Sequence, residues 1–333
     1  MPDSPSPQSR GGHSRADNLS AETRSEIARR AAATRWAAAD TLPDGTPLRS
    51  ICGSIDHPLR LGTVPVECYV LNSEQRVLVV DALARVLGLG KAAKGKRAAD
   101  RLLEIAESNA LRPHVSIELH EQIRKPIRFE VYEPSRIALG YEAGVLLGLA
   151  RAVMAASNAG ALHHAQGKMT HMTAWLIQKM NEEELRDMID EQTRFPAFED
   201  KHVLAKRLRN KVPRPLRPWL ETFPTVFFEG IAHHMETSLA TAAHEPDDFA
   251  ACIEEFAWKR LPPSIRESVS RLKPQSPGGS ARRGATPRWY TERECQPDLR
   301  RHLAVISALM LAADSYEEFK RFLERATTEY PEP

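Results

Sequence analysis

Acidic side chains gather at residues 182–191 and form the densest polar cluster of the 333-residue chain. Asp187 lies three residues before Asp190 and four before Glu191, so on a helix these carboxylates share a face and could hold a divalent cation. Such an ion would permit metal-assisted phosphodiester chemistry. The alternative is an acidic face that is solvated or paired with arginines. Adjacent carboxylates point apart on a helix, and no second acidic motif has nuclease spacing, so we assign no catalytic residue and no metal site.

Basic residues gather at three places, and basic patches with nearby aromatic rings are typical of nucleic-acid surfaces. The first patch holds seven basic residues and no acid before Trp219: Lys201, Lys206, Arg207, Arg209, Lys211, Arg214 and Arg217. The second comprises Lys91, Lys94, Lys96, Arg97 and Arg101. The third comprises Arg282, Arg283 and Arg288, with Trp289 and Tyr290 beside them. The alternative is that these patches form a solvated surface whose positive charge is balanced by the acidic helix at residues 182–191.

Other residues with catalytic potential lack the spacing that catalysis needs. The histidine pairs at 163–164 and 233–234 do not form the zinc-protease motif, and we interpret His302 as a packing residue. The chain has no GxxxxGK[ST] phosphate loop and no GxSxG nucleophile elbow. These absences favour a binding protein over an enzyme and predict no cofactor.

Composition places the chain among ordinary globular proteins. Hydrophobic residues make up 42% and charged residues 27%, and the net charge of +2 means that any nucleic-acid surface must be local. No apolar stretch approaches the roughly 20 residues of a membrane span, and the N-terminus has no signal-peptide core. The four cysteines lack zinc-knuckle and CxxC spacing, so we expect free thiols in the cytoplasm.

Periodicity and turn residues predict an α+β fold, with a small strand-containing N-terminal part packed on a larger, mostly helical C-terminal part. We expect a disordered tail over 1–18, an arginine-containing helix over 19–39, a strand-rich region over 50–135 and a helical region over 139–327. The expected elements are a hairpin of strands 64–71 and 76–80, a short helix from Asp81, a strand over 126–132, helices over 225–238, 247–260 and 298–312, an exposed loop over 273–287 and a last helix with Ser315 as its N-cap.

Several segments occur in an order that is more specific than any one of them. They are LSAETRSEIARRAAATRW, VECYVLNSEQRVL followed by ALARVLGLG, MIDEQTRF, the stretch from Arg217 through WLETFP to Phe228, and RRGATPRWYTERECQPDLRRHLAVISALMLAADSYEEFKRFLERA. Together they resemble the bacteriophage p-sixty-three C-terminal domain family: the first segment is similar to a short element often found ahead of the domain, and the others resemble the domain itself over roughly residues 50–327. The family has no assigned activity, and the resemblance implies a phage- or prophage-associated protein. Its acidic centre, matched here by Asp190, Glu191 and Thr193, has a glycine where this chain has Arg194.

Three functions remain open from the sequence. The first is a regulatory or accessory protein that binds DNA or RNA through the basic patches. The second is a protein–protein interaction module, similar to phage antirepressors, that engages a phage or host regulatory protein. The third and weakest is a metal-dependent enzyme that uses Asp190 and Glu191. The arginine-containing helix is interpreted as a segment that docks on a partner or is disordered, rather than as a reader of DNA.

Overall fold

The computed structural model describes residues 39–89, 98–132, 135–162, 167–274 and 289–331. The predicted tail over 1–18, nearly all of the arginine-containing helix and most of the predicted loop over 273–287 lie outside these residues. Most of the second basic patch, Lys91 to Arg97, and three arginines of the third, Arg282, Arg283 and Arg288, lie outside them as well.

The N-terminal half is built on a curled antiparallel sheet of five strands. Its spatial order is β1 (Ser50–Cys52), β4 (Cys68–Leu71), β5 (Arg76–Val79), β7 (Arg136–Glu142) and β6 (Ile127–Val131). The two outer strands approach each other where Arg49 forms a bridge with Glu130, and the Glu130 amide donates to the Leu48 carbonyl at 2.9 Å. The curl encloses a small core of its own, in which Tyr69 meets Phe129 edge to face.

The predicted hairpin and the helix after it are confirmed. Strand β4 pairs with β5 around a turn in which Glu74 takes a positive φ of 64°. Helix α3 (Val80–Val86) begins directly after β5, and the chain turns at Gly88 with φ 74°. A second pair of strands, β2 (Leu59–Leu61) and β3 (Val64–Val66), forms a separate two-stranded ribbon.

Strand β7 was not expected, because we predicted a helix from about Leu139 onward. The strand runs to Glu142 and pairs with β6 on one side and β5 on the other. Gly140 permits this central position, since a Cβ there would lie 2.2 Å from Cγ1 of Val77. The predicted strand over 126–132 is confirmed as β6.

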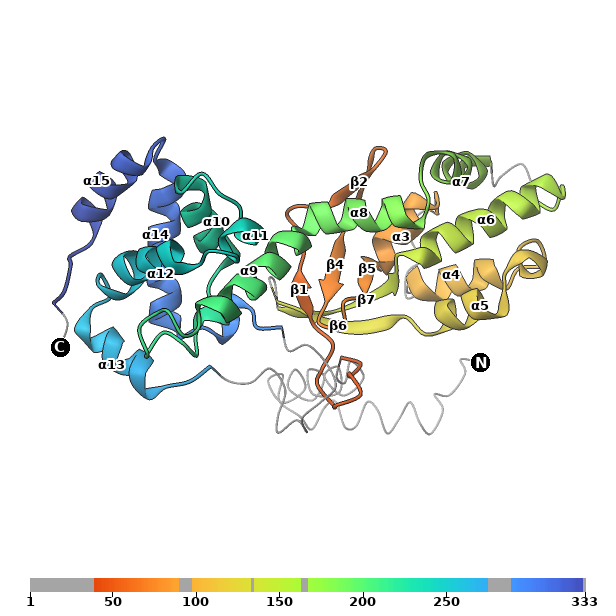
Figure 1. Cartoon of the computed structure of the whole chain (residues 1–333). Coiled ribbons are helices and arrows are strands. Elements are labelled where there is room, and N and C mark those ends of the chain that lie inside the picture. The colour runs from red at the N-terminus through yellow and green to blue at the C-terminus, as the bar shows by residue number, and fades with distance from the viewer. Residues whose placement is uncertain (1–38, 90–97, 133–134, 163–166, 275–288, 332–333) are drawn as a thin grey trace, which may run out of the picture.

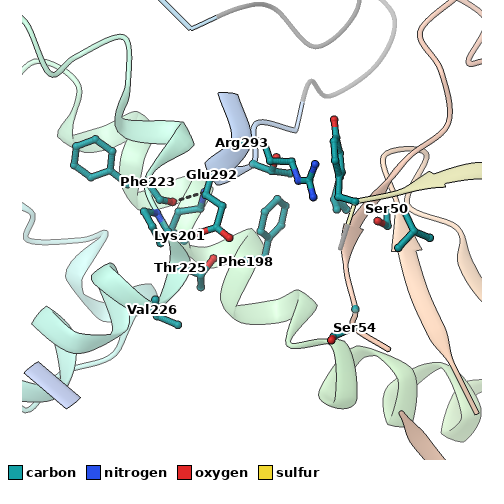
Figure 2. Close-up of a pocket in the computed structure, with 15 residues that line it drawn as sticks. Ser50, Ser54, Phe198, Lys201, Phe223, Thr225, Val226, Glu292 and Arg293 are labelled. Atoms are coloured by element: carbon teal, nitrogen blue, oxygen red, sulfur yellow. Dashed lines mark hydrogen bonds between the residues drawn. The ribbon is translucent and has the colours of Figure 1, made fainter. Parts of the chain in front are cut away.

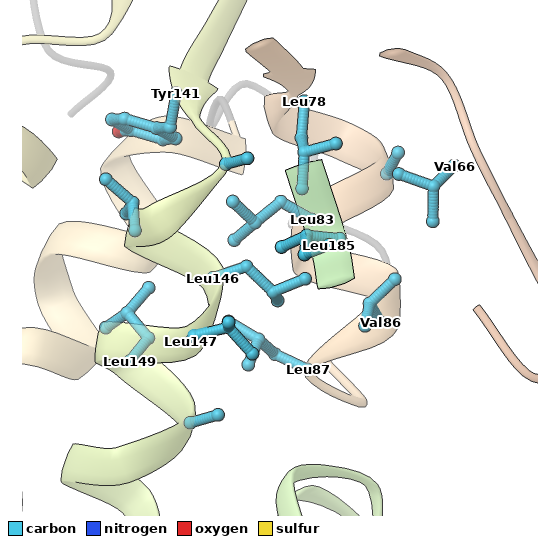
Figure 3. Packing of buried hydrophobic residues seen from close by; sticks show 14 of the residues in the cluster. Val66, Leu78, Leu83, Val86, Leu87, Tyr141, Leu146, Leu147, Leu149 and Leu185 are labelled. Carbon is cyan, nitrogen blue, oxygen red and sulfur yellow. The ribbon is translucent and has the colours of Figure 1, made fainter. Parts of the chain in front are cut away.

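Helices cover the outer face of the sheet (Figure 1). They are α4 (Ala98–Ala106), the turn η1 (Arg112–His114), α5 (Ile117–Arg124), α6 (Gly144–Asn158), α7 (Gly167–Lys179) and α8 (Glu182–Thr193). Figure 3 shows Leu146 and Leu147 of α6 packed against Leu83 of α3 and Leu185 of α8. Burial of these aliphatic side chains, each about 1.5–3 kcal/mol, stabilises the packing of helices on sheet.

The C-terminal half is helical, as predicted. It comprises α9 (Phe195–Leu208), η3 (Leu220–Thr222), α10 (Thr225–His234), α11 (Leu239–Ala242), α12 (Asp247–Ile253), the π-helical turn η4 (Glu254–Trp258), α13 (Pro263–Arg271), η5 (Glu292–Glu294), α14 (Pro297–Ala312) and α15 (Tyr316–Ala326). Six buried phenylalanines dominate its core: Phe223, Phe227, Phe228, Phe249, Phe256 and Phe319. The predicted cap is confirmed, since the Ser315 hydroxyl accepts from the Glu318 amide at 3.2 Å.

Helices α8 and α9 run end to end and join the two halves (Figure 1). Arg194 separates them in a left-handed conformation, with φ 59° and ψ 30°. The late segment that contains Trp289 returns to this junction, where its indole packs against Phe195, Phe198 and His202. The chain is therefore an α+β protein whose halves share a buried aromatic junction.

Candidate anion-binding cleft

A cleft of about 720 Å³ opens where the start of β1 and the end of β6 meet the start of α14. We call it the basic cleft, because four basic side chains and only two carboxylates line it. The basic residues are Arg49, Lys273, Arg293 and Arg300, and the carboxylates are Glu130 and Glu294.

Arg49 is the innermost cation of the basic cleft, with its side chain only 7% exposed. Its guanidinium donates to the Glu294 carboxylate, to the Trp289 carbonyl at 2.8 Å and to the Tyr132 hydroxyl at 3.4 Å. Its Nε is buried and has no hydrogen-bond partner among the residues that the structure describes. Burial of an unpaired donor costs about 1–3 kcal/mol.

The Glu294 carboxylate is largely neutralised by its neighbours. Besides the Arg49 guanidinium, it accepts from the Thr291 amide at 2.8 Å and from the Thr291 hydroxyl at 2.7 Å. Lys273 and Arg300 are exposed and form no ion pair with any residue in the described ranges. The side chains of the basic cleft therefore carry a surplus of positive charge.

Arg293 stands between the basic cleft and a smaller cleft of about 330 Å³. Its guanidinium lies over the ring of Tyr132, and both residues line both clefts. Figure 2 shows Arg293 and Glu292 at the mouth of the smaller cleft, with Lys201 beneath them.

The start of α14 contributes little further to anion binding. Pro297 has no amide hydrogen, the Leu299 amide donates to the Gln296 side chain, and the Arg300 amide donates to the Gln296 carbonyl. Because these helix-start groups are already satisfied, the attraction for an anion comes from side-chain cations rather than from the helix dipole.

Lys201, which the sequence assigned to a nucleic-acid surface, is buried and only 1% exposed. Its ammonium donates to the Glu221 carbonyl at 2.8 Å and to the Phe223 carbonyl at 3.4 Å. Burial lowers the pKa of Lys201 to about 7. Lys201 therefore ties α9 to the η3 turn and cannot contact a phosphate backbone. The signal that we missed is helical spacing, since Lys201 shares the buried face of α9 with Phe198, Leu204 and Leu208.

The other basic residues of the first patch divide into two groups. Arg207 donates to the Ala243 carbonyl at 2.8 Å, Lys211 pairs with Asp247, and Arg217 donates to the Val212 carbonyl at 3.1 Å. The second group is exposed, and its side chains make no hydrogen bond or ion pair with a residue that the structure describes. We call this group, Lys206, Arg209 and Arg214, the exposed basic turn.

Trp289 was also expected to face nucleic acid, but it is 8% exposed and packed into the aromatic junction. A ring held between Phe198 and His202 offers no free face for a base, so it is no stacking platform.

The acidic centre does not converge on one point. The Arg76 guanidinium donates to both carboxylate oxygens of Asp190, at 2.8 and 2.7 Å. Glu191 is exposed, and the buried Thr193 hydroxyl donates to the Ile189 carbonyl at 2.7 Å. Among the described residues, no three His, Cys, Asp or Glu side chains lie close enough together to hold a metal ion. Asp190 is therefore paired with an arginine, which was the alternative to a cation site.

His234 and His302 are packing residues, whereas His171 and His233 are exposed. The His234 ring stacks on Phe319 at 5.2 Å, and its Nε2 lies 3.1 Å from the Met310 carbonyl. Burial lowers the pKa of His302, whose Nε2 has no partner. His163 and His164 lie outside the described residues.

The residues of the basic cleft were mostly missed by the sequence analysis. Arg49 lies more than 200 residues before Lys273 and Arg300 in the sequence, and the three residues belong to no common motif. Only Arg293 lies next to a predicted patch. Pairing of distant segments, which no local pattern encodes, brings the four together.

All four cysteines are free thiols. Within the described ranges, no helix combines the length and the apolar character needed to cross a bilayer. Comparisons with protein-family models, with curated proteins and with solved structures each find no match to this chain.

Proposed function

We propose that the protein binds single-stranded nucleic acid, whose phosphates enter the basic cleft. The observation that carries the proposal is the surplus of cations in one concave site. Arg49 contributes a guanidinium that is 7% exposed, and Lys273 and Arg300 are exposed and form no ion pairs among the described residues. Phosphate groups that meet such side chains release counterions, which supplies most of the affinity in non-specific binding.

A single strand suits this geometry better than a duplex. Proteins that read duplex DNA insert a projecting helix or ribbon into a groove, whereas the basic cleft is concave. Positively charged grooves that follow one backbone are the usual sites for single strands. The resemblance to the phage family adds the proposal that this binding serves a regulatory or accessory role of a phage or prophage in the cytoplasm.

The test is fluorescence anisotropy with labelled DNA and RNA, single-stranded and duplex, across a salt series. We expect single strands to bind best, and log K to fall linearly with log salt. The slope for single strands is about −0.7 for each phosphate contacted, so three contacts predict a slope of about −2. The absence of binding at low salt would remove the proposal.

Two double variants locate the surface. Lys273→Ala with Arg300→Ala removes two cations of the basic cleft, and Arg209→Ala with Arg214→Ala removes two from the exposed basic turn. All four side chains are exposed, and the net-charge change is the same. We expect only the first pair to lower affinity, by about tenfold, and to reduce the salt slope by about 1.4. Equal losses of affinity in the two double variants would mean that the net charge of the protein, rather than the basic cleft, determines binding of nucleic acid.

A second candidate function is partner binding through the outer face of α14. Val305 and Leu311 are 45% and 75% exposed there, and no charged residue interrupts the helix from Leu303 to Ala312. Exposed apolar patches of this kind mark protein interaction sites. A partner that co-purifies with the wild-type chain and is lost with Leu311→Asp, while nucleic-acid binding persists, would favour this function.

A further inference from the structure

A groove of about 1,060 Å³ lies between α5, α6 and the start of α8. Small residues of α6 line it: Gly144, Gly148, Ala152 and Ala155. Gly144 and Ala155 are the accessible members, so a helix or an extended segment can approach α6 closely there, whereas Leu119 of α5 packs over Gly148 and Ala152 is only 3% exposed. We call this site the α6 groove.

Carboxylates outnumber free cations along the α6 groove. Glu74, Glu142 and Glu183 are exposed at its rim and form no ion pair with a described residue. Its arginines are already engaged by carboxylates, since Arg76 and Arg186 approach Asp190 at 2.7 and 4.0 Å, and Arg151 contacts Glu182 at 2.9 Å. The chemistry of the groove therefore favours a small-residue segment that carries positive charge.

The predicted arginine-containing helix has this composition. Residues 19–38 hold seven alanines and four arginines against two glutamates. The alanines suit a floor of glycine and alanine, and Arg24, Arg29, Arg30 and Arg35 equal in number the carboxylates of the groove that form no ion pair with a described residue, Glu74, Glu118, Glu142 and Glu183.

The described chain also begins within reach of the α6 groove. Ala39 is only 3% exposed, and Asp40 is fixed on β6, where its amide donates to the Arg128 carbonyl at 2.8 Å. Arg128 in turn pairs with Leu139 of β7. Asp40 and Leu139 are separated by two strand spacings across the sheet, and Glu142 of the groove lies three residues farther along β7. The distance from Asp40 to Glu142 is therefore about 14 Å. Six residues, 34–39, span about 20 Å when extended, which is enough to cover this distance.

We propose that residues 19–38 dock into the α6 groove of the same chain. In this arrangement the arginines pair with Glu74, Glu142 and Glu183, and the alanines contact the α6 floor. The docking stands apart from the nucleic-acid function, because none of the groove residues lines the basic cleft.

Trypsin tests the docking on the full chain, because it cleaves after arginine. Arg10 and Arg15 precede the segment and act as internal references for cleavage of undocked chain. We expect Arg29 and Arg30 to be cut about tenfold more slowly than Arg10 and Arg15, since cleavage follows the population of the open form. High salt should abolish the difference. Equal rates at low salt would overturn the proposal.

Charge reversal separates docking in the α6 groove from other causes of protection. Glu142→Lys with Glu183→Lys should bring cleavage at Arg29 and Arg30 to the rate at Arg10. The matched control is Glu317→Lys with Glu324→Lys, two exposed carboxylates on α15 with the same charge change. Thermal melting verifies that both variants fold. Docking within one chain would be overturned by any of three results. Protection of Arg29 and Arg30 from trypsin could persist in the Glu142→Lys, Glu183→Lys variant, could rise with protein concentration, or could require added oligonucleotide.

Discussion

The guanidinium of Arg76 on β5 holds the carboxylate of Asp190 on α8 with two hydrogen bonds, of 2.8 and 2.7 Å. The two side chains are 10% and 16% exposed, and the Arg76 guanidinium also lies 4.7 Å from the centre of the Phe195 ring. The pair therefore fastens the helix that joins the two halves to a central strand of the sheet. The residue that looked most like a metal ligand in the sequence is part of the scaffold.

Loss of this pair should cost stability and leave binding intact. We expect Asp190→Ala to lower the free energy of unfolding by about 3 kcal/mol, because it leaves the Arg76 guanidinium buried without its partner. Glu191→Ala, one residue on and exposed, should change it by less than about 0.5 kcal/mol. Urea unfolding measures both. An Asp190 variant that unfolds like the Glu191 variant would contradict the structural role.

Arg194 occupies a backbone conformation that suits glycine better. Its φ of 59° ends α8, and at such positions a Cβ costs about 1 kcal/mol. Arg194→Gly should therefore raise the free energy of unfolding by up to about 1 kcal/mol, less a few tenths for the exposed ion pair with Glu229.

Arg194→Ala is the matched control for this prediction. It loses the ion pair and keeps the Cβ, so it should be no more stable than the wild type. Chemical unfolding of the three proteins side by side would show the order, and a glycine variant below the alanine variant would contradict it.

Lys201 should give the protein a pH-dependent stability above neutrality. Burial lowers its folded pKa to about 7, whereas in the unfolded chain the amine stays protonated to about pH 10. Between pH 7 and 8 the unfolded state thus binds the additional proton, so stability rises with pH, by about 1 kcal/mol. Burial lowers the pKa of His202 to about 3, so below about pH 6.5 the unfolded state binds a proton that the folded state does not. His202 therefore lowers the stability of the protein as the pH falls below about 6.5.

Unfolding free energies of the wild type and of Lys201→Met at pH 7 and pH 8 test this slope. The variant should lose the rise, whatever its absolute stability. The range stops at pH 8, because the cysteines have raised folded pKa values, about 11 for Cys295, and ionise in the unfolded chain above it. A slope that persists in the variant would show that Lys201 is not its source.

Arg266 holds the last described residues against the helical half. Its guanidinium donates to the carbonyls of Trp258, Lys259, Tyr330 and Pro331, at 2.8 to 3.1 Å. Arg266→Ala should destabilise the protein by about 3 kcal/mol, because it removes four hydrogen bonds from a buried charged donor and the packing of that guanidinium over the Trp258 ring. Arg271→Ala, on the same helix but exposed and paired only with Glu267, should cost less than about 0.5 kcal/mol. Thermal melting compares the two, and equal shifts would contradict this role of Arg266.

Local signals sufficed for much of the fold and little of the site. The hairpin of β4 and β5 follows from β-branched runs around Asn72, and the last helix from the Ser315 cap. Strand β7 could not be predicted from local signals, because it leads directly into α6 and depends on the close contact of Gly140 with Val77 across the sheet. Lys201 and Trp289 carry the residue types of a nucleic-acid surface, and only tertiary packing buries them. The basic cleft has no local signal at all.

The packing of Trp289 into the aromatic junction constrains the order in which the chain can fold. During synthesis from the N-terminus, residues 39–208 emerge before Trp289, whose ring lies about 90 residues after Phe195 and Phe198 in the chain. Arg49 likewise gains Glu294 and the Trp289 carbonyl as partners only when that segment has emerged. Until then the aromatic junction lacks its indole and the Arg49 guanidinium lacks its carboxylate, so the first half reaches its final packing only after the late segment is made.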